Sequence, residues 1–211
     1  MNTNPHTTRN IATYALLWFL LFASGCGDKV PPLQKLSGNA VVVAFGDSIT
    51  YGTGAKDEES YPAQLEDITG LQVINEGIPG EVSAKGLERL PDVLDEHQPE
   101  LLILCHGGND LLRKRSTKQL ASNLLAMINV ARSRGIQVAL IGVPEPALFL
   151  LKSAPLYVEV ASKENIPIDS ITLPEVESDN DLKSDTIHPN AAGYRKLAEG
   201  VATLLKRAGA I

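Results

Sequence analysis

The sequence predicts an α/β fold built around one doubly wound parallel sheet. From about residue 40 to residue 206, apolar runs of strand length alternate with segments whose apolar residues repeat at helical spacing. Each connection is long enough for a right-handed crossover between parallel strands. Glycine-rich turns follow the first three expected strands, which places those turns on one edge of the sheet. Ligands bind at the carboxyl edge of such sheets, so we expect the functional residues there.

The first half of the chain is expected to supply three strands and two helices. A valine-rich run is typical of a buried parallel strand, and Ser60 with Pro62 is typical of a helix start. Gly70 ends that helix, while Pro91 either bends the next helix or marks a start within it. In chain order, the expected elements are a strand over 41–45, a helix over 61–68, a strand over 71–74, a helix over 83–96 and a strand over 101–105.

The second half continues the alternation. Its clearest amphipathic segment runs from Thr117 to Arg134, where apolar side chains repeat on one face and Gly135 provides a stop. After this helix we expect a strand over 137–143, a helix over about 155–163, a strand over 166–168 and a last helix over 190–206.

Composition limits the possible partners. The chain has 211 residues and a formal net charge of −6, which fits one globular domain with a substantial core. An acidic balance without a long basic cluster argues against nucleic acid as a partner. The short basic run at residues 113–115 is explained by a solvated turn.

The amino-terminal segment has the features of a targeting signal. Arg9 precedes a mostly apolar stretch over 11–23, which is too short to span a bilayer. The small residues before Cys26 resemble the lipobox of bacterial lipoproteins, in which the cysteine is acylated. An ordinary signal peptide, or a Cys26 without a role, is the alternative.

We therefore expect a lipoprotein signal peptide at residues 1–25, a tether at 26–38 and one folded domain at 39–211. Gly27 after the cysteine favours the periplasmic side of the outer membrane of a bacterial cell envelope. If Cys26 carries lipid, Cys105 has no disulfide partner and is most simply a small buried apolar residue.

Three residues have the types that nucleophilic hydrolysis requires. Ser48 follows the first strand, at the sheet edge where a nucleophile would be accessible. His188 lies just before the last helix, because Pro189 disfavours helical geometry at the preceding residue. Asp185, three residues earlier, can fold back and accept a hydrogen bond from the imidazole. Read alone, each motif is equally compatible with a turn or a solvated loop.

Backbone and side-chain amides suited to binding an oxyanion follow the same strands. Gly80 offers an exposed N–H after the second strand, and Asn109 offers a side-chain NH2 after the third. The N–H of Ser48 itself is a third donor. A plain tight turn at Gly80 and an Asx turn at Asn109 are the alternatives.

These segments together resemble the four ordered blocks of the SGNH hydrolases, also called GDSL esterases. The blocks are residues 45–48, 75–80, 107–110 and 185–189, and the resemblance runs from about residue 40 to residue 205. It is strongest to the bacterial thioesterase I/lysophospholipase L1 group. The resemblance implies a three-layer α/β/α fold with a five-stranded sheet, and no metal or organic cofactor. It also implies that Ser48 is the nucleophile, that His188 and Asp185 complete a triad, and that Gly80 and Asn109 bind the oxyanion.

Two further residues near these blocks need an interpretation. His106 directly precedes the glycine pair and is the only rival base, although Asp110, interpreted as structural, is the only aspartate near it. Asp47 is interpreted as a carboxylate that stabilises the turn.

Apolar residues at the same edge suggest an acyl groove, with core packing as the alternative. The groove candidates are Leu111, Leu112, Leu148 and Phe149.

The resulting hypothesis is a lipid-anchored serine hydrolase that cleaves carboxylic esters or thioesters. Its substrates would be small-molecule esters, thioesters or lysophospholipids. A carbohydrate O-acetylesterase on the same fold is the alternative enzyme. A non-catalytic lipoprotein that binds an envelope ligand is the alternative from another class.

Overall fold

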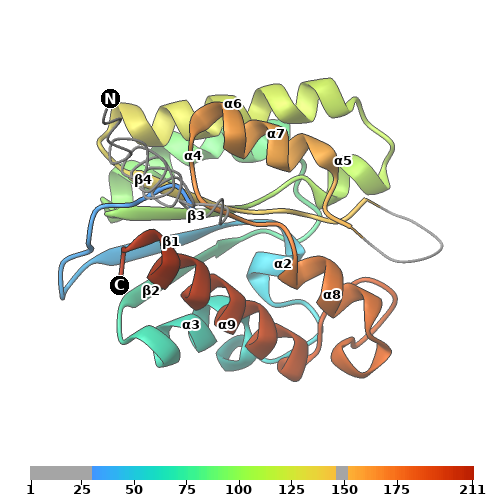
Figure 1. Ribbon diagram of the computed structural model, residues 1–211. Coiled ribbons are helices and arrows are strands. Elements are labelled where there is room, and N and C mark those ends of the chain that lie inside the picture. The colour runs from blue at the N-terminus through green and yellow to red at the C-terminus, as the bar shows by residue number, and fades with distance from the viewer. Residues whose placement is uncertain (1–29, 146–151) are drawn as a thin grey trace, which may run out of the picture.

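Five parallel strands form one sheet in the computed structural model, which describes residues 30–145 and 152–211 (Figure 1). The expected signal peptide, Cys26, and the groove candidates Leu148 and Phe149 lie outside the described residues. The sheet order is β2-β1-β3-β4-β5. The strands are β1 (Val41–Gly46), β2 (Gln72–Gly77), β3 (Leu101–Cys105), β4 (Gln137–Ile141) and β5 (Ile168–Asp169).

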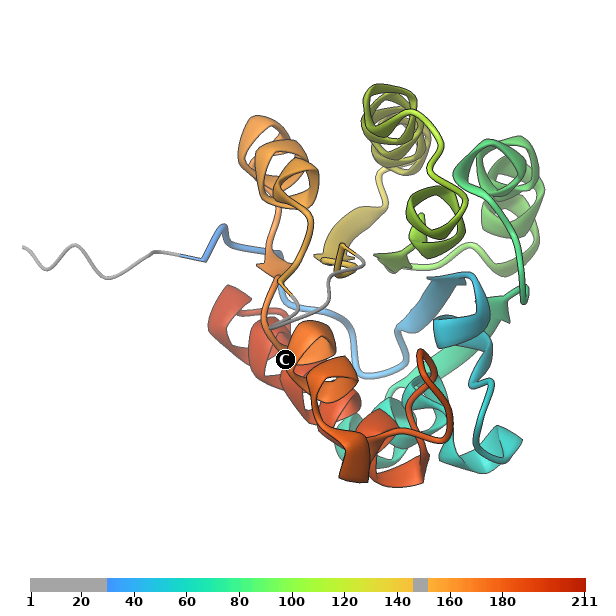
Figure 2. The ribbon, with the colours of Figure 1, turned by 90° about the vertical axis from the view of Figure 1, so that its right-hand side faces the viewer.

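The strand order reverses beside β1, and this reversal creates the place where ligands bind in open α/β sheets. β1 leads to β2 on one side, and the chain then crosses to β3 on the other. The register pairs Gly46 with both Gly77 and Cys105, so the carboxyl ends of these three strands are level. Figure 2 views the molecule from this edge, with the turn after β1 and the loop before the last helix facing the reader.

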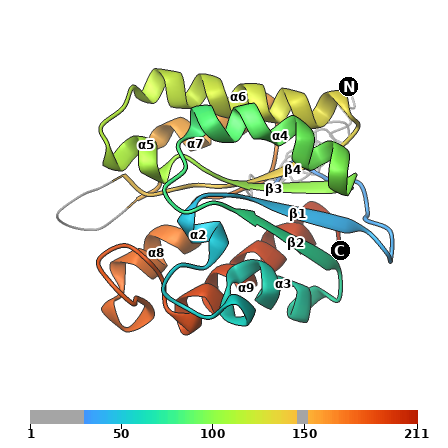
Figure 3. The ribbon, with the colours of Figure 1, turned by 180° about the vertical axis from the view of Figure 1, so that it is seen from behind.

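Helices cover both faces of the sheet, as the alternating pattern predicts (Figures 1 and 3). One face of the sheet carries α3 (Tyr61–Thr69), α8 (Thr172–Ser178) and the carboxyl-terminal helix α9 (Ala191–Ala208). The opposite face carries α4 (Ser83–His97), α6 (Thr117–Ser133) and α7 (Pro155–Glu164). None of the helices in the described ranges is both long and apolar enough to cross a bilayer.

All five expected helices are confirmed within two residues at each end, and Pro91 lies inside a continuous α4. The short helices are not predicted, because three to seven residues are too few for a periodic pattern. They are α2 (Ser48–Tyr51), the 3₁₀ helices η2 (Asp57–Glu59) and η3 (Asn180–Leu182), α5 (Gly108–Leu112), and the seven-residue α8.

The expected end of the second strand at residue 74 is wrong. β2 continues through Asn75 and Glu76 to Gly77, paired in parallel with β1. Hydrogen bonds to the neighbouring strand stabilise this polar segment, and local composition cannot report them. The strand expected over 137–143 ends at Ile141, and the one expected over 166–168 lies at 168–169 instead.

The segment expected to be a tether is also different where the structure describes it. Leu33 and Leu36 donate backbone hydrogen bonds to the carbonyls of Ala208 and Ala210, at 2.8 and 2.9 Å. Leu36 is buried in the core cluster, and Ser37 bonds the Glu100 carboxylate. Because apolar side chains and backbone groups both find partners on the domain, the folded unit begins before residue 39.

Three buried tyrosines connect the core to the edge that carries the site. The Tyr157 hydroxyl donates to the carbonyl of His106 at 2.8 Å, and the Tyr194 hydroxyl donates to the carbonyl of Thr53 at 2.8 Å. Tyr61 lies 3.4 Å from the Thr50 hydroxyl. Cys105 is free and fully buried, and burial raises the pKa of its thiol well above the usual value, so it is an inert core residue as expected.

Candidate active site

Ser48 is the first residue of α2, immediately beyond β1. The chain turns sharply here, and the turn requires glycine at position 46. A side chain there would overlap the Cys105 carbonyl oxygen and the Thr50 hydroxyl. Asp47 caps the short helix by accepting the N–H of Ile49 at 3.2 Å. The Ser48 side chain is therefore held at the helix start, where its own N–H has no intrahelical acceptor.

Ser48, His188 and Asp185 form a continuous chain of hydrogen bonds. Ser48 Oγ lies 3.1 Å from His188 Nε2, and His188 Nδ1 lies 2.7 Å from Asp185 Oδ2. The serine and histidine are 140 residues apart in sequence. Because Nδ1 faces a carboxylate, it carries the proton, which leaves Nε2 as an acceptor for the serine hydroxyl.

The loop that carries His188 is fixed by its own backbone. Ser184 donates its N–H to the carbonyl of His188 at 2.9 Å, and Lys183 forms an isolated bridge with Pro189. Asn190 caps α9 by accepting the N–H groups of Ala192 and Gly193, each at 3.0 Å. The imidazole is thus presented from a closed turn in front of a capped helix.

The Asp185 carboxylate is held in its ionised form. Burial raises its pKa, but hydrogen bonds from the N–H and ring of His188 and from the N–H of Ile187 outweigh this effect and bring the pKa to about 2. Asp185 therefore keeps its charge at any pH where the histidine could act as a base. It both orients the ring and favours a positive charge on it.

The three candidate oxyanion donors lie at neighbouring strand ends. Gly80 is exposed in the turn after β2, with φ +78°, and its N–H donates no hydrogen bond within the described residues. Its carbonyl accepts from Arg113 at 3.0 Å. Asn109 is the second residue of α5, after β3. Together with the N–H of Ser48, these groups come from the edge where β1, β2 and β3 are level.

Asp47 does more than cap α2. It is buried, and its Oδ2 lies against Gly108 of the turn after β3, where an added Cβ would come within 3.2 Å of it. Burial raises the pKa of Asp47, although the nearby His106 and the hydrogen bond from the Ile49 N–H oppose this rise. The carboxylate thus links the turn that carries Ser48 to the turn that carries Asn109.

The groove candidates are placed only in part. Leu111 is buried in the hydrophobic core, while Leu112 is 46% exposed at the end of α5. Core packing, the alternative interpretation, therefore holds for Leu111.

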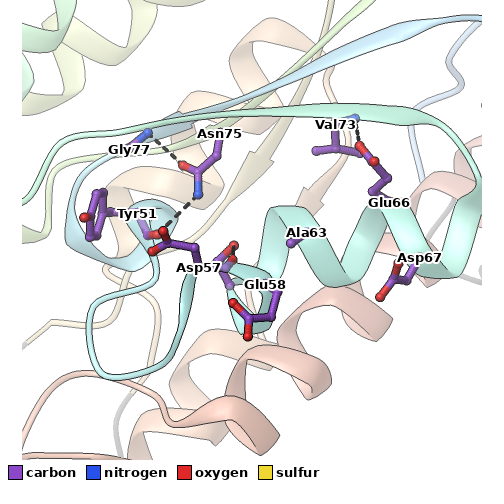
Figure 4. A pocket seen from close by; sticks show the side chains of 10 residues that line it. Tyr51, Asp57, Glu58, Ala63, Glu66, Asp67, Val73, Asn75 and Gly77 are labelled. Atoms are coloured by element: carbon purple, nitrogen blue, oxygen red, sulfur yellow. Dashed lines mark hydrogen bonds between the residues drawn. The ribbon is translucent and has the colours of Figure 1, made fainter.

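A pocket of about 520 Å³ lies beside α2, but it contains neither His188 nor Asp185 (Figure 4). Tyr51, Val73 and Asn75 line it together with four carboxylates. Its charged residues are Asp57, Glu58, Glu66 and Asp67. Such a lining repels anions and disfavours an apolar chain, so this pocket is unsuited to an acyl group.

Sequence reasoning missed one group of charged residues near the site. Glu81, directly after Gly80, bonds both His106 and Arg89, and Asp110 instead accepts two hydrogen bonds from Ser83. Asp110 thus agrees with its structural interpretation. No local spacing could have paired Glu81 with His106, because they are 25 residues apart on different turns.

The pKa of Glu177 on α8 makes the stability of the fold depend on pH. Burial raises its pKa to about 8, the charge on Asp47 adds to the rise, and Lys183 opposes it. An acid whose pKa is higher in the folded protein stabilises the fold while protonated. The free energy of unfolding should therefore fall as the pH rises from about 4.5 to about 8.

Glu177→Gln should remove this decrease. One pKa unit corresponds to about 1.4 kcal/mol, and because the side chain is partly exposed we expect a gain of about 2 kcal/mol over the wild type at pH 9, and none at pH 4. Urea unfolding across this range measures it, with Glu175→Gln on the same helix as the control. Parallel stability profiles for Glu177→Gln and the wild type would contradict this expectation.

Comparisons with known proteins identify the family of this chain. Residues 44–196 match the GDSL-like Lipase/Acylhydrolase family. "Esterase TesA" of Pseudomonas aeruginosa is 32% identical over 200 residues, which cover 88% of this chain and 97% of that protein. "Thioesterase 1/protease 1/lysophospholipase L1" of Escherichia coli (strain K12) is 27% identical, over 78% of this chain and 83% of that protein.

Solved structures give the same result. The crystal structure of TesA is 32% identical, with a TM-score of 0.72, and covers 79% of this chain and 98% of its own. The crystal structure of AlinE4, described as an SGNH-hydrolase family esterase, is also 32% identical, with a TM-score of 0.64 over 82% of this chain and 98% of its own. The ordered blocks, the sheet and these matches show that the chain belongs to the GDSL, or SGNH, family of lipases and acylhydrolases.

Proposed function

We propose that this protein is a serine hydrolase of carboxylic esters and thioesters, with Ser48 as its nucleophile. A single observation carries the proposal, namely the continuous hydrogen-bonded chain from Ser48 Oγ through His188 to Asp185. Nucleophile, base and orienting carboxylate in this relation are the parts of a serine-hydrolase triad. The esterase and thioesterase names of its relatives agree with this reaction class.

In the first half of the reaction, Ser48 Oγ attacks the acyl carbonyl carbon while its proton passes to His188 Nε2. Asp185 holds the resulting imidazolium through Nδ1. His188 then gives the proton to the leaving alcohol or thiol, and an acyl–serine ester remains. In the second half, a water molecule attacks this ester, and the same histidine first accepts its proton and then returns a proton to Ser48.

The oxyanion formed in each half is stabilised by the N–H groups of Ser48 and Gly80 and by the side chain of Asn109. These neutral donors are directed to the charge only as it develops, and each is worth about 10²- to 10³-fold in rate in such sites. The Asp47 carboxylate lies against Gly108, directly before Asn109, and so helps to fix the turn that carries this donor.

A series of substrates tests this function. We expect p-nitrophenyl esters and acyl thioesters with chains longer than acetyl to be hydrolysed with higher kcat/KM than acetylated sugars. Purified wild-type protein would be assayed with acetyl, butyryl, octanoyl and decanoyl esters beside acetylated xylose and mannose. A clear preference for the sugars would instead identify a carbohydrate O-acetylesterase, and binding without turnover would identify a non-catalytic protein.

The place of action is proposed from the sequence alone. Acylation of Cys26 would hold the domain at a membrane surface on the envelope side. Mass spectrometry of the mature amino-terminal peptide tests this, because an unmodified Cys26, or cleavage elsewhere, would contradict the anchor.

A further inference from the structure

A buried histidine and a buried glutamate connect the two turns that carry the oxyanion donors. His106 directly precedes the turn with Asn109, and Glu81 directly follows Gly80. His106 Nε2 lies 3.0 Å from Glu81 Oε2, and the two side chains are 0% and 7% exposed. A charge-assisted hydrogen bond without competing water is both strong and directional. The contact therefore fixes one turn relative to the other.

Glu81 is fixed from its other side by Arg89 of α4. Arg89 Nε donates to both carboxylate oxygens, at 2.9 and 3.0 Å. Its Nη2 donates to the carbonyl of Glu76 at 2.8 Å, and its guanidinium carbon lies 4.0 Å from the centre of the Phe45 ring. Burial raises the pKa of Glu81, but the hydrogen bonds from His106 and Arg89 lower it by more. The pKa therefore lies below its usual value, and the carboxylate stays ionised. The pair is thus attached to the ends of β1 and β2.

The imidazole occupies a space shaped to hold it. A side chain at Gly86 of α4 would overlap His106 Nε2, and the Phe45 ring lies 5.8 Å away, centre to centre. His106 Nδ1 is buried and has no partner among the described residues. A buried nitrogen without a partner costs free energy that an apolar side chain would not incur. The bond from Nε2 to Glu81 is what an apolar residue could not supply.

This arrangement also bears on the alternative that His106 is the catalytic base. Its ring is inaccessible to solvent, and Nε2 already bonds Glu81, whereas His188 faces Ser48 directly. Within the described residues, no hydrogen bond joins the His106 ring to Ser48.

We infer that His106 is a positioning residue that acts through Glu81 to set the separation between the Gly80 N–H and the Asn109 amide. The inference rests on the proposed function, because it assigns the two donors to one oxyanion. A misplacement of about 1 Å in such a site costs up to about 10²-fold in rate. Substrate binding depends less on these donors, since the oxyanion forms only during the reaction.

Kinetics of full-length variants on a p-nitrophenyl ester test the inference. His106→Leu should lower kcat by about 10- to 100-fold and change KM by less than about 3-fold. His106→Gln, whose amide nitrogen can take the place of Nε2, should recover most of the loss. The matched control is His97→Leu, because His97 bonds Glu76 at 2.9 Å and Glu76 also accepts from Arg89, so this variant disturbs the same group of charges but leaves the contact between Glu81 and His106 in place. It should keep kcat within about 2-fold of the wild type.

A double-mutant cycle separates positioning from a general loss of structure. When His106→Leu is added to Asn109→Ala, kcat should fall by less than about 3-fold more, because the donor that His106 positions is already absent. If His106→Leu fails to fold by thermal denaturation, Glu81→Gln, of the same size, is expected to lower kcat in the same way. Effects that multiply fully in the cycle, or a kcat within 3-fold of the wild type for a folded variant, would overturn the inference.

The same experiments distinguish this failure from failure of the proposed function. Activity that does not depend on Ser48 would contradict the function itself. Activity that depends on Ser48 but is unaffected at His106 would contradict only the positioning role.

Discussion

Replacing Ser48 with alanine is expected to abolish ester hydrolysis, with a loss in kcat of about 10⁶-fold, as when the nucleophile of a serine triad is removed. The change removes only Oγ, whose one side-chain partner among the described residues is His188, at 3.1 Å. The fold should be unaffected, with the free energy of unfolding within about 1 kcal/mol of the wild type. Hydrolysis of p-nitrophenyl butyrate and urea unfolding, measured on the same preparation, give both quantities.

A serine far from the site provides the control. Ser133 ends α6 and bonds only the Val130 carbonyl among the described residues, at 2.8 Å, so Ser133→Ala should keep full activity. If a folded Ser48→Ala protein hydrolysed the ester at more than a few per cent of the wild-type rate, Ser48 would not be the nucleophile.

Replacing His188 with alanine is expected to lower kcat by about 10⁴- to 10⁶-fold, because Ser48 then has no base to accept its proton. His97→Ala is the control, since it also removes a histidine that pairs with a carboxylate, in this case Glu76, at the end of α4. The double variant Ser48→Ala with His188→Ala should be no slower than Ser48→Ala alone, because the two residues act in one step.

Two other results would contradict this role of His188. If His188→Ala lowered kcat by less than about 10-fold, the catalytic base would be another residue. Losses that multiplied in the double variant would mean that Ser48 and His188 act in separate steps.

The sheet and the proposed site residues were predictable because the information for them is local. The valine-rich run before Gly46 and the amphipathic spacing after Thr117 specify buried strand and helix without reference to distant residues. Since parallel strands end at a common edge, Ser48, Gly80 and Asn109 were expected to come together, and the level register of β1, β2 and β3 brings their turns to one edge. The short spacing of Asp185 and His188 made their pairing predictable as well.

Other features depend on contacts between distant segments. β2 runs through polar residues because β1 supplies its hydrogen bonds, and residues 33–37 are ordered by the carboxyl-terminal helix and by Glu100. The Glu81–His106 pair joins two turns that only the folded sheet brings together. Hydrophobic pattern and turn composition contain no information on such pairings.

Reaction of the purified protein with a fluorophosphonate probe, followed by peptide mass spectrometry, tests the central claim most directly. The probe forms a stable bond only to a serine activated by a base, so its site identifies the nucleophile. We predict one label per chain, on Ser48, with loss of esterase activity in proportion to labelling and with much slower labelling of His188→Ala. Labelling of another residue in step with the loss of activity, or full activity in protein labelled at Ser48, would contradict the account.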